Sequence, residues 1–195
     1  MAHRRRFGGG RGQPLARAVG LKGEDAPFVL DATAGVGTDA FVLATLGCTV
    51  TLIERLPEAV RALRRALAAA GIHAETSAIT DRMTLLEGDA IELIGRWRSP
   101  PPDVIYLDPM YPHPKNKAAN SKSMTVLQQL AGPDTDSDAL LAAALTLATR
   151  RVVVKRPVKA PRVAGPEPSG SVQSTNTRYD LYGGALLAAN QSDLP

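Results

Sequence analysis

Short apolar runs recur along the chain at spacings typical of β-strands, and helical patterns lie between most of them. The first run ends at a glycine turn around Gly35, and an apolar stretch at 40–44 follows, an order that predicts strand, turn and helix. Five runs are strong strand candidates and two are weaker. They span 28–33, 48–54, 83–88, 104–108 and 151–155, with 179–182 and 185–189 as the weaker pair.

Two of the intervening segments predict amphipathic helices. Pro57 suits the first turn of a helix and Gly71 suits its end. The apolar stripe between them consists of Val60, Leu63, Leu67 and Ala70. A second helix is expected to begin near Asp136 and Ser137, which can cap it. Its apolar positions are Leu140, Leu141, Ala144, Leu145 and Leu147.

This alternation predicts an α/β fold, with a mostly parallel sheet covered by helices on both faces. Ligands of such sheets bind beyond the carboxyl ends of the strands. Four acids stand at the expected strand ends, namely Asp31, Glu54, Asp89 and Asp108. We therefore expect a ligand site along one rim of the sheet. Residues 157–176, rich in Pro, Gly and Ser, are expected to form a long loop.

Length and composition indicate a single globular domain. The 195 residues, 44% of them hydrophobic, can bury a sizeable core, which excludes a disordered chain. We expect a basic, glycine-rich N-terminal arm over 1–25 and one domain over 26–195. The single cysteine, Cys48, is expected to be buried, and its lack of a disulfide partner fits a reducing cytoplasm. No run of about 18 apolar residues occurs, so no membrane partner is expected. The motifs indicate no metal site.

Positive charge is concentrated in three segments. Fifteen of the 23 Lys and Arg residues fall in 1–22, 111–130 and 150–162, which contain no acid. The rest of the chain has eight basic residues and all 19 acids. This segregation favours an anionic partner, for which nucleic acid is the natural candidate, and a solvated basic surface is the alternative.

The glycine turn Gly35-Val36-Gly37-Thr38-Asp39-Ala40 fits the loose G-x-G-x-x-A pattern of nucleotide-binding turns. Glycine suits such a turn because it tolerates a positive φ and lets the backbone approach a ligand. A nicotinamide cofactor is one interpretation. Asp31, four residues before Gly35, favours S-adenosylmethionine, because a carboxylate there can bind the ammonium of a methionine moiety and would repel a pyrophosphate.

Other residues near the turn fit the same cofactor. Glu54 is placed to accept hydrogen bonds from both ribose hydroxyls, as either cofactor would need, and Asp89 can bind the adenine amino group. Thr38 and Asp39 are expected in the cofactor shell, with helix capping as their alternative role. For Asp31 and Glu54 the alternatives are a turn cap and an exposed acid.

Asp108-Pro109-Met110-Tyr111 is similar to the (Asp/Asn)-Pro-Pro-(Tyr/Phe) motif of methyltransferases that act on planar nitrogens. An exocyclic base amine is a poor nucleophile, because its lone pair is delocalised into the ring. Asp108 and the Pro109 carbonyl can accept its N–H bonds, and Tyr111 can stack on the base, a contact worth about 1–3 kcal/mol. Catalysis would then rest on proximity and alignment. A strand-ending turn capped by Asp108 is the structural alternative.

Basic residues around this motif and in the N-terminal arm are the candidate RNA contacts. His113 stands in a basic loop, where a phosphate or solvent contact is expected rather than a general base. Lys155 and Arg156 end another strand and are expected to contact phosphate or substrate, or else to lie on a plain surface. The expected RNA-binding set is Arg4, Arg5, Arg6, Arg11, His113, Lys115, Lys155 and Arg156.

Several strings resemble the RsmJ-type family of 16S ribosomal RNA (guanine-N2)-methyltransferases. The most specific are Phe7-Gly8-Gly9-Gly10-Arg11-Gly12 and Asp108-Pro109-Met110-Tyr111-Pro112-His113. Further resemblance lies in the segments 18–23, 31–40, 132–134 and 152–157. The resemblance therefore covers almost the whole chain. Family members usually carry some tens of residues before the basic glycine-rich stretch, whereas this chain begins within that stretch. We therefore expect either a truncated or a compact member of the family.

The resemblance implies a Rossmann-like methyltransferase fold with a seven-stranded sheet. It implies methyl transfer from S-adenosylmethionine to the N2 amine of a guanosine in small-subunit ribosomal RNA, as naked RNA or in the assembled subunit. The cofactor contacts that it implies are Thr38, Asp39, Glu54, Arg55, Asp89, Ala90 and Asp108. Two other classes stay open: an amino-methyltransferase for DNA adenine or protein glutamine, and a non-catalytic RNA-binding assembly factor.

Overall fold

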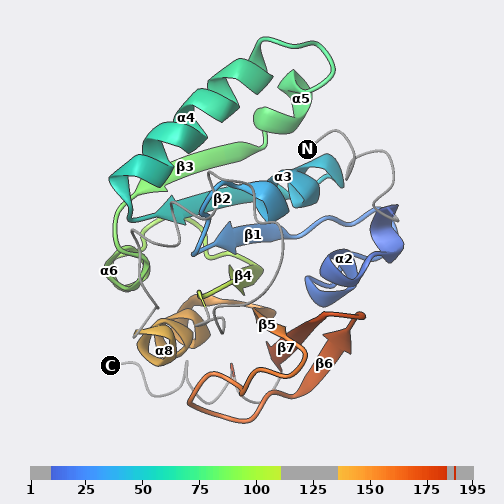
Figure 1. The fold of residues 1–195 in the computed structure, drawn as a ribbon, viewed down its shortest axis with the longest axis vertical. Helices are drawn as coiled ribbons and strands as arrows, with labels where there is room; N and C mark the ends of the chain where they lie inside the picture. Colours follow the sequence, from blue (N-terminus) through green and yellow to red (C-terminus); the bar gives the residue numbers. More distant parts are fainter. Residues whose placement is uncertain (1–9, 111–135, 184–186, 188–195) are drawn as a thin grey trace.

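A seven-stranded sheet forms the centre of the computed structural model, which describes residues 10–110, 136–183 and 187. The strand order β3-β2-β1-β4-β5-β7-β6 runs from top to bottom in Figure 1. Strands β1 to β5 are parallel, and β7 and β6 are antiparallel to their neighbours. The strands are β1 Phe28–Asp31, β2 Thr49–Glu54, β3 Met83–Glu87, β4 Val104–Leu107, β5 Arg151–Pro157, β6 Gly170–Gln173 and β7 Thr177–Gly183.

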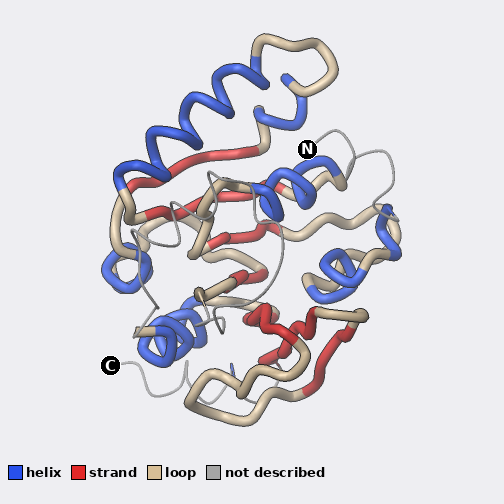
Figure 2. The backbone as a smooth tube through the Cα atoms, in the orientation of Figure 1, coloured by secondary structure: helices blue, strands red, loops and turns tan. Residues whose placement is uncertain are grey.

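Helices flank the strands on both sides, as Figure 2 shows. Residues of α2, α3, α4 and α5 pack into one apolar cluster with Val29 of β1, whereas α6 and α8 pack into a second cluster with Leu30. Successive strand residues thus face opposite layers, so the central strands need apolar residues at every position. The helices are η1 Gly10–Gly12, α2 Pro14–Ala18, α3 Thr38–Thr45, α4 Pro57–Gly71, α5 Ser77–Thr80, α6 Ala90–Gly95 and α8 Ser137–Leu147.

The predicted α/β fold with helices on both faces is confirmed, and so are the five strong strand candidates, with ends shifted by at most two residues. Helix α4 begins at Pro57 and ends at Gly71, as predicted. Helix α8 begins where expected, but the carboxylate of its N-cap residue, Asp136, makes no capping hydrogen bond and pairs with Arg55 instead.

Two expectations about the C-terminal half were wrong. Residues 157–176 are not one long loop, because β6 lies inside this segment and forms the edge of the sheet. Only Val172 of β6 is buried, so the segment has no alternation that would reveal a strand. The seventh strand of the described sheet is therefore β6. Of the strand candidate at 185–189 only Leu187 is described, and Leu187 is helical.

Residues 10–25 of the predicted N-terminal arm lie within the fold. Helix α2 and its C-cap residue are buried in the same apolar cluster as Cys48, through Leu15, Ala16, Ala18 and Val19. The guanidinium of Arg11 donates to the carbonyls of Gly23 and Leu46, so it ties η1 to the end of α3. Within the described residues no helix is long and apolar enough to cross a membrane.

Candidate functional site

The carboxyl ends of the parallel strands bring the four predicted acids to one rim of the sheet. Asp31 and Glu54 are the last residues of β1 and β2. Asp89 caps α6 just beyond β3, and Asp108 directly follows β4. The predicted placement of these acids is thus confirmed, and each lies where a doubly wound sheet binds its ligands.

The glycine turn after β1 has the backbone that its sequence predicts. Gly35 and Gly37 have φ values of +54° and +71°, in the left-handed region that favours glycine. A Cβ on Gly37 would lie 2.7 Å from Leu63 Cδ1 of α4, whereas a Cβ on Gly35 would meet nothing within 4 Å. A side chain at Gly37 would require Leu63 to move as well as an unfavourable φ, whereas Gly35 faces open space.

Glu54 is fixed by backbone groups on both of its carboxylate oxygens. Oε2 accepts a hydrogen bond from Gly35 N at 2.7 Å, and Oε1 accepts one from Leu56 N at 2.8 Å. Each oxygen keeps a second lone pair, so Glu54 can still accept hydroxyl hydrogen bonds. This geometry suits a ribose whose two hydroxyls meet one carboxylate.

A partly buried polar cluster lies beside the turn. Lys155 Nζ of β5 is 2.7 Å from Asp39 Oδ2 and 2.8 Å from Asp108 Oδ2. The hydroxyl of Tyr106, the third residue of β4, donates to the same Asp39 oxygen at 2.8 Å. The Asp108 backbone N–H in turn donates to Thr33 Oγ1 at 2.6 Å. These contacts join three segments that are far apart in the sequence: residues 33–39, residues 106–108 and β5.

Asp31 borders this cluster and is almost completely buried. The pKa of Asp31 is raised from 3.8 to about 8, mainly by burial and in part by the charges of Asp39 and Asp108, against the hydrogen bond from Thr33 N and the charge of Lys155. Burial also raises the pKa of Asp108, while the Lys155 ammonium opposes that change. Burial alone would lower the pKa of Lys155, but the two carboxylates outweigh it and raise that pKa.

The cluster therefore holds three carboxyl groups against one ammonium. A buried surplus of carboxyl groups is costly unless a cation joins it. A ligand with an ammonium and a sulfonium would supply positive charge here, whereas a pyrophosphate would add to the repulsion. The donor set thus fits the methionine end of S-adenosylmethionine, and Asp31 and Asp39 are the residues that would face it.

Asp89 and Arg55 stand on the other side of Glu54 along the rim. Asp89 Oδ1 caps α6 by accepting hydrogen bonds from Ile91 N and Glu92 N, and its Oδ2 lies 3.7 Å from an Arg55 nitrogen. The same Arg55 nitrogen is 2.5 Å from Asp136 Oδ2 at the start of α8. The Asp89 side chain is 35% exposed at the rim, and Ala90 follows it as the first residue of α6.

The predicted chemistry site is described only in part. Asp108 and Pro109 lie at the rim, with 41% of the Asp108 side chain exposed. Asp108 Oδ2 faces Lys155, and no described residue donates a hydrogen bond to Oδ1. Tyr111, His113 and Lys115 lie outside the described residues, as do Arg4, Arg5 and Arg6.

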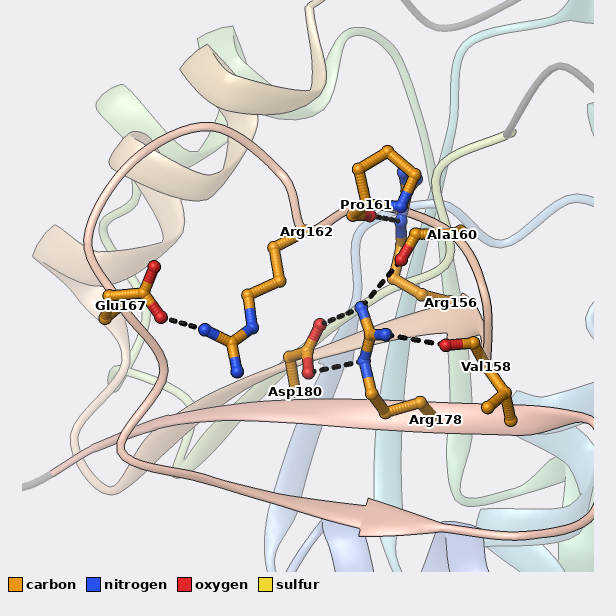
Figure 3. A network of polar contacts seen from close by, with 8 residues as sticks. All are labelled: Arg156, Val158, Ala160, Pro161, Arg162, Glu167, Arg178 and Asp180. Carbon is orange, nitrogen blue, oxygen red and sulfur yellow. Dashed lines mark hydrogen bonds and ion pairs between the residues drawn. The ribbon is translucent and has the colours of Figure 1, made fainter.

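The structure places Lys155 and Arg156 away from an open phosphate-binding surface. Lys155 is paired within the acid cluster, and Arg156 is buried, with its Nε donating to the Pro161 carbonyl. Figure 3 shows the neighbouring Arg178, which pairs with buried Asp180 and donates to the carbonyls of Val158 and Ala160. The two arginines thus clamp the loop that follows β5 at the same rim.

Sequence reasoning missed the contacts of Tyr106, Thr33 and Lys155. The sequence predicts Tyr106 only as a strand residue, and it predicts Lys155 as a contact to phosphate or substrate or as a plain surface residue. Asp39, Asp108 and Lys155 are far apart in the sequence, so no spacing reveals that one ammonium joins them. The one available signal was the end of β5, which places Lys155 at the rim that the four acids occupy.

Comparisons with known proteins agree with this geometry. Residues 1–184 match the sequence family described as "Putative SAM-dependent methyltransferase". A protein of Stutzerimonas stutzeri named ribosomal RNA small subunit methyltransferase J is 55% identical over 181 residues, which cover 93% of this chain and 70% of the relative. The protein of that name in Pseudomonas fluorescens is 53% identical over 188 residues, with 96% and 72% covered.

Solved structures share the fold. A SAM-dependent methyltransferase from Neisseria gonorrhoeae is 35% identical, with a TM-score of 0.72 over 88% of this chain and 71% of the other. An rRNA methyltransferase from Streptomyces viridochromogenes is only 15% identical but has a TM-score of 0.59, with 91% and 84% covered. The second likeness supports the fold alone.

Proposed function

The chain belongs to the family of SAM-dependent methyltransferases that includes ribosomal RNA small subunit methyltransferase J, and we propose that it methylates the N2 amine of a guanosine in small-subunit ribosomal RNA. The fold, the rim of acids and the relatives' names all support a methyltransferase. The names of the relatives support ribosomal RNA as the substrate class. The choice of guanine N2 comes from the RsmJ-type family that the sequence resembles.

The state of Asp108 is the observation that carries the proposal. Its Oδ2 is held by Lys155, its backbone N–H is held by Thr33, and part of its side chain is exposed at the rim. Oδ1 can therefore accept an N–H of a planar amine placed at the rim. Such a bond orients the amine and raises the electron density on its nitrogen. After transfer, the same carboxylate can take the proton that the nitrogen loses.

The cofactor site follows from the neighbouring residues. Asp31 and Asp39 would face the methionine ammonium, Glu54 the ribose hydroxyls, and Asp89 the adenine amino group, with Gly35, Gly37, Thr38, Arg55 and Ala90 around them. When bound, S-adenosylmethionine supplies a methyl group on a positively charged sulfur. The chain's own contribution is to hold Asp108 within reach of that methyl group, so that proximity and alignment accelerate the reaction.

The proposal extends to the partner and the compartment. Small-subunit RNA, naked or in the assembled subunit, would be bound by the basic residues of the N-terminal arm and of the segment 111–130. With a substrate of this kind, we propose that the protein acts in the cytoplasm. Pro109 and Tyr111 would complete the base pocket, through a carbonyl acceptor and an aromatic face.

Mass spectrometry of small-subunit ribosomal RNA nucleosides from a strain without this gene tests the proposal. We expect loss of one N2-methylguanosine site, which returns when the wild-type gene is restored and does not return with Asp108→Ala. A full complement of N2-methylguanosine in the deletion strain would contradict the proposal. If the deletion strain lacked an N6-methyladenosine site in place of an N2-methylguanosine site, the target base would be adenine and the reaction would still be methyl transfer to an amine.

A further inference from the structure

The Lys155 ammonium lies between two carboxylates that come from different elements. It is 2.7 Å from Asp39 Oδ2 in the first turn of α3 and 2.8 Å from Asp108 Oδ2 beyond β4. Only 24% of the Lys155 side chain is exposed. Two short charge-assisted hydrogen bonds therefore hold one ammonium in a largely enclosed position.

This arrangement is poorly suited to the phosphate contact that the sequence predicts for Lys155. A phosphate approaching Nζ would compete with two carboxylates that already bind it, and it would be repelled by their charges. Lysines that bind phosphate keep an accessible ammonium. The position of Lys155 thus favours a role within the site.

We infer that Lys155 is a positioning residue for methyl transfer: it fixes Asp108 through Oδ2, so that Oδ1 faces the target amine as an ionised acceptor. This inference rests on the proposed function, because it assigns Lys155 a part in that same reaction. Lys155 touches neither the base nor the methyl group and acts only through Asp108 and Asp39. The pair Tyr106 and Asp39 anchors the other side of the ammonium, since the Tyr106 hydroxyl donates to the oxygen that Lys155 also binds.

The charge of Asp108 depends on the groups that face it. These come from four elements: Asp31 of β1, Asp39 of α3, Tyr106 of β4, and Lys155 and Arg156 of β5. Burial and the Asp39 charge raise the Asp108 pKa, whereas Lys155 lowers it through its charge and its hydrogen bond. Without Lys155, two carboxylates would face each other with no ammonium between them, and one would bind a proton at a higher pH. A protonated Asp108 can no longer accept the proton that the amine loses.

The test compares Lys155→Met with Lys155→Arg and with a surface control. Lys155→Met keeps the length of the side chain and removes its charge, whereas Lys155→Arg keeps the charge. Arg96→Met removes one cation from an exposed pair with Glu92 on α6, and it should leave the kinetics unchanged. Each protein is assayed for methyl transfer to small-subunit RNA between about pH 5.5 and 9, a range in which a carboxyl with a raised pKa titrates and an ordinary aspartate, with a pKa of about 3.9, does not.

We expect Lys155→Met to move the acid limb of the kcat profile upward by about one pH unit or more, which is roughly a tenfold loss of kcat on that limb. The KM for RNA should stay within about twofold, because the proposal gives Lys155 no contact with phosphate. Lys155→Arg should restore much of the wild-type profile. A merely structural role would lower the thermal midpoint of both variants without moving the pH profile.

A second readout does not depend on turnover. In the full chain with 13C-labelled aspartate, the Asp108 carboxyl resonance, assigned with Asp108→Asn, should titrate at a higher pH in Lys155→Met than in the wild type. Unchanged titration together with an unchanged kcat profile would overturn the inference. So would weaker RNA binding with a salt slope smaller by about one, which indicates a lost phosphate contact. A wild-type protein that methylates no small-subunit RNA would contradict the proposed function, while the titration would still decide the coupling of Lys155 to Asp108.

Discussion

The Gly35 backbone N–H donates to Glu54 Oε2 at 2.7 Å, which joins the glycine turn after β1 to the acid that ends β2. The Leu56 N–H binds the other oxygen at 2.8 Å. The Glu54 carboxylate therefore has its orientation fixed by the backbone before a ligand binds. Such preorganisation lowers the entropy that binding would otherwise cost.

This geometry makes Glu54→Ala a specific test of the cofactor site. The change would leave two ribose hydroxyls without a carboxylate partner, and each poorly satisfied polar group costs about 1–3 kcal/mol. We expect calorimetry to show weaker binding of S-adenosylmethionine and of its demethylated product by at least about tenfold. The control is Glu87→Ala: Glu87 pairs with Glu54 in the β2–β3 register, but its side chain binds Arg64 at the surface. Equal losses in the two variants, or tight binding of NAD in place of S-adenosylmethionine, would contradict the assignment.

The buried carboxyl of Asp31 predicts an opposition between stability and binding. Its pKa is 3.8 when unfolded and about 8 when folded, so the folded state holds a proton that the unfolded state releases between these values. Stability therefore falls as the pH rises through this window. Asp31→Asn keeps the shape and removes the titration, so it should stabilise the protein by a few kcal/mol at pH 8 and by much less near pH 5.

Urea unfolding at the two pH values measures this difference, and cofactor titration of the same protein measures the loss of binding. In the wild type, an ammonium that binds the ionised Asp31 should expel the proton. Calorimetry in buffers with different ionisation enthalpies should then show net proton release on cofactor binding at pH 7. Two results would show that Asp31 is already ionised in the free protein. One is an equal gain in the free energy of unfolding of Asp31→Asn at both pH values, and the other is the absence of proton release when the wild type binds the cofactor.

The parts of the fold that the sequence could predict are those whose residues carry a local signal. Val152, Val153 and Val154 are apolar in succession because β5 is covered on both faces, and this run alone indicates a buried strand. Strand β6 has no such run, since it forms only by pairing with β7 at the edge of the sheet. Its existence depends on tertiary contacts that four mostly exposed residues do not encode.

The candidate site divides in the same way. The acids at the strand ends were predictable, because parallel strands bring their carboxyl ends to one rim. The ion pairs of Lys155 were not, because they depend on how far β5 extends beyond β4 and on the angle of α3. The role of Arg178 was hidden for the same reason: its partners Val158 and Ala160 are distant in sequence and are joined to it only through the β5–β7 register.

The Arg178 clamp predicts a large difference between two arginine substitutions. Arg178 pairs with Asp180, whose side chain is 1% exposed, so Arg178→Ala would leave an uncompensated buried carboxylate. We expect a loss of about 3–5 kcal/mol in the free energy of unfolding, measured in urea. Arg162→Ala breaks an exposed pair with Glu167 on the same loop and should cost at most about 1 kcal/mol. Similar values for the two variants would show that the clamp does not hold the loop.

The segregation of charge predicts how RNA binding depends on salt. If the N-terminal arginines bind phosphate, the logarithm of RNA affinity falls linearly with the logarithm of salt concentration. Replacing Arg4, Arg5 and Arg6 with Ala should then flatten this slope by about two to three. The matched control replaces Arg61, Arg64 and Arg65 of α4 and removes the same charge. An unchanged slope in the first variant would indicate that the N-terminal arginines form only a solvated basic surface. An equal change in the second variant would indicate that the arginines act only through net charge.

Identification of the methylated nucleoside in vitro tests the central claim most directly. Purified protein, labelled S-adenosylmethionine and small-subunit RNA or subunits are incubated, and the RNA is digested to nucleosides. With the wild type we predict label in N2-methylguanosine. With Asp108→Asn we predict a loss of at least about 100-fold in turnover. The RNA binding of this variant should stay close to wild type, because the shape of the side chain is kept. Label in N6-methyladenosine, or wild-type turnover in Asp108→Asn, would contradict the account.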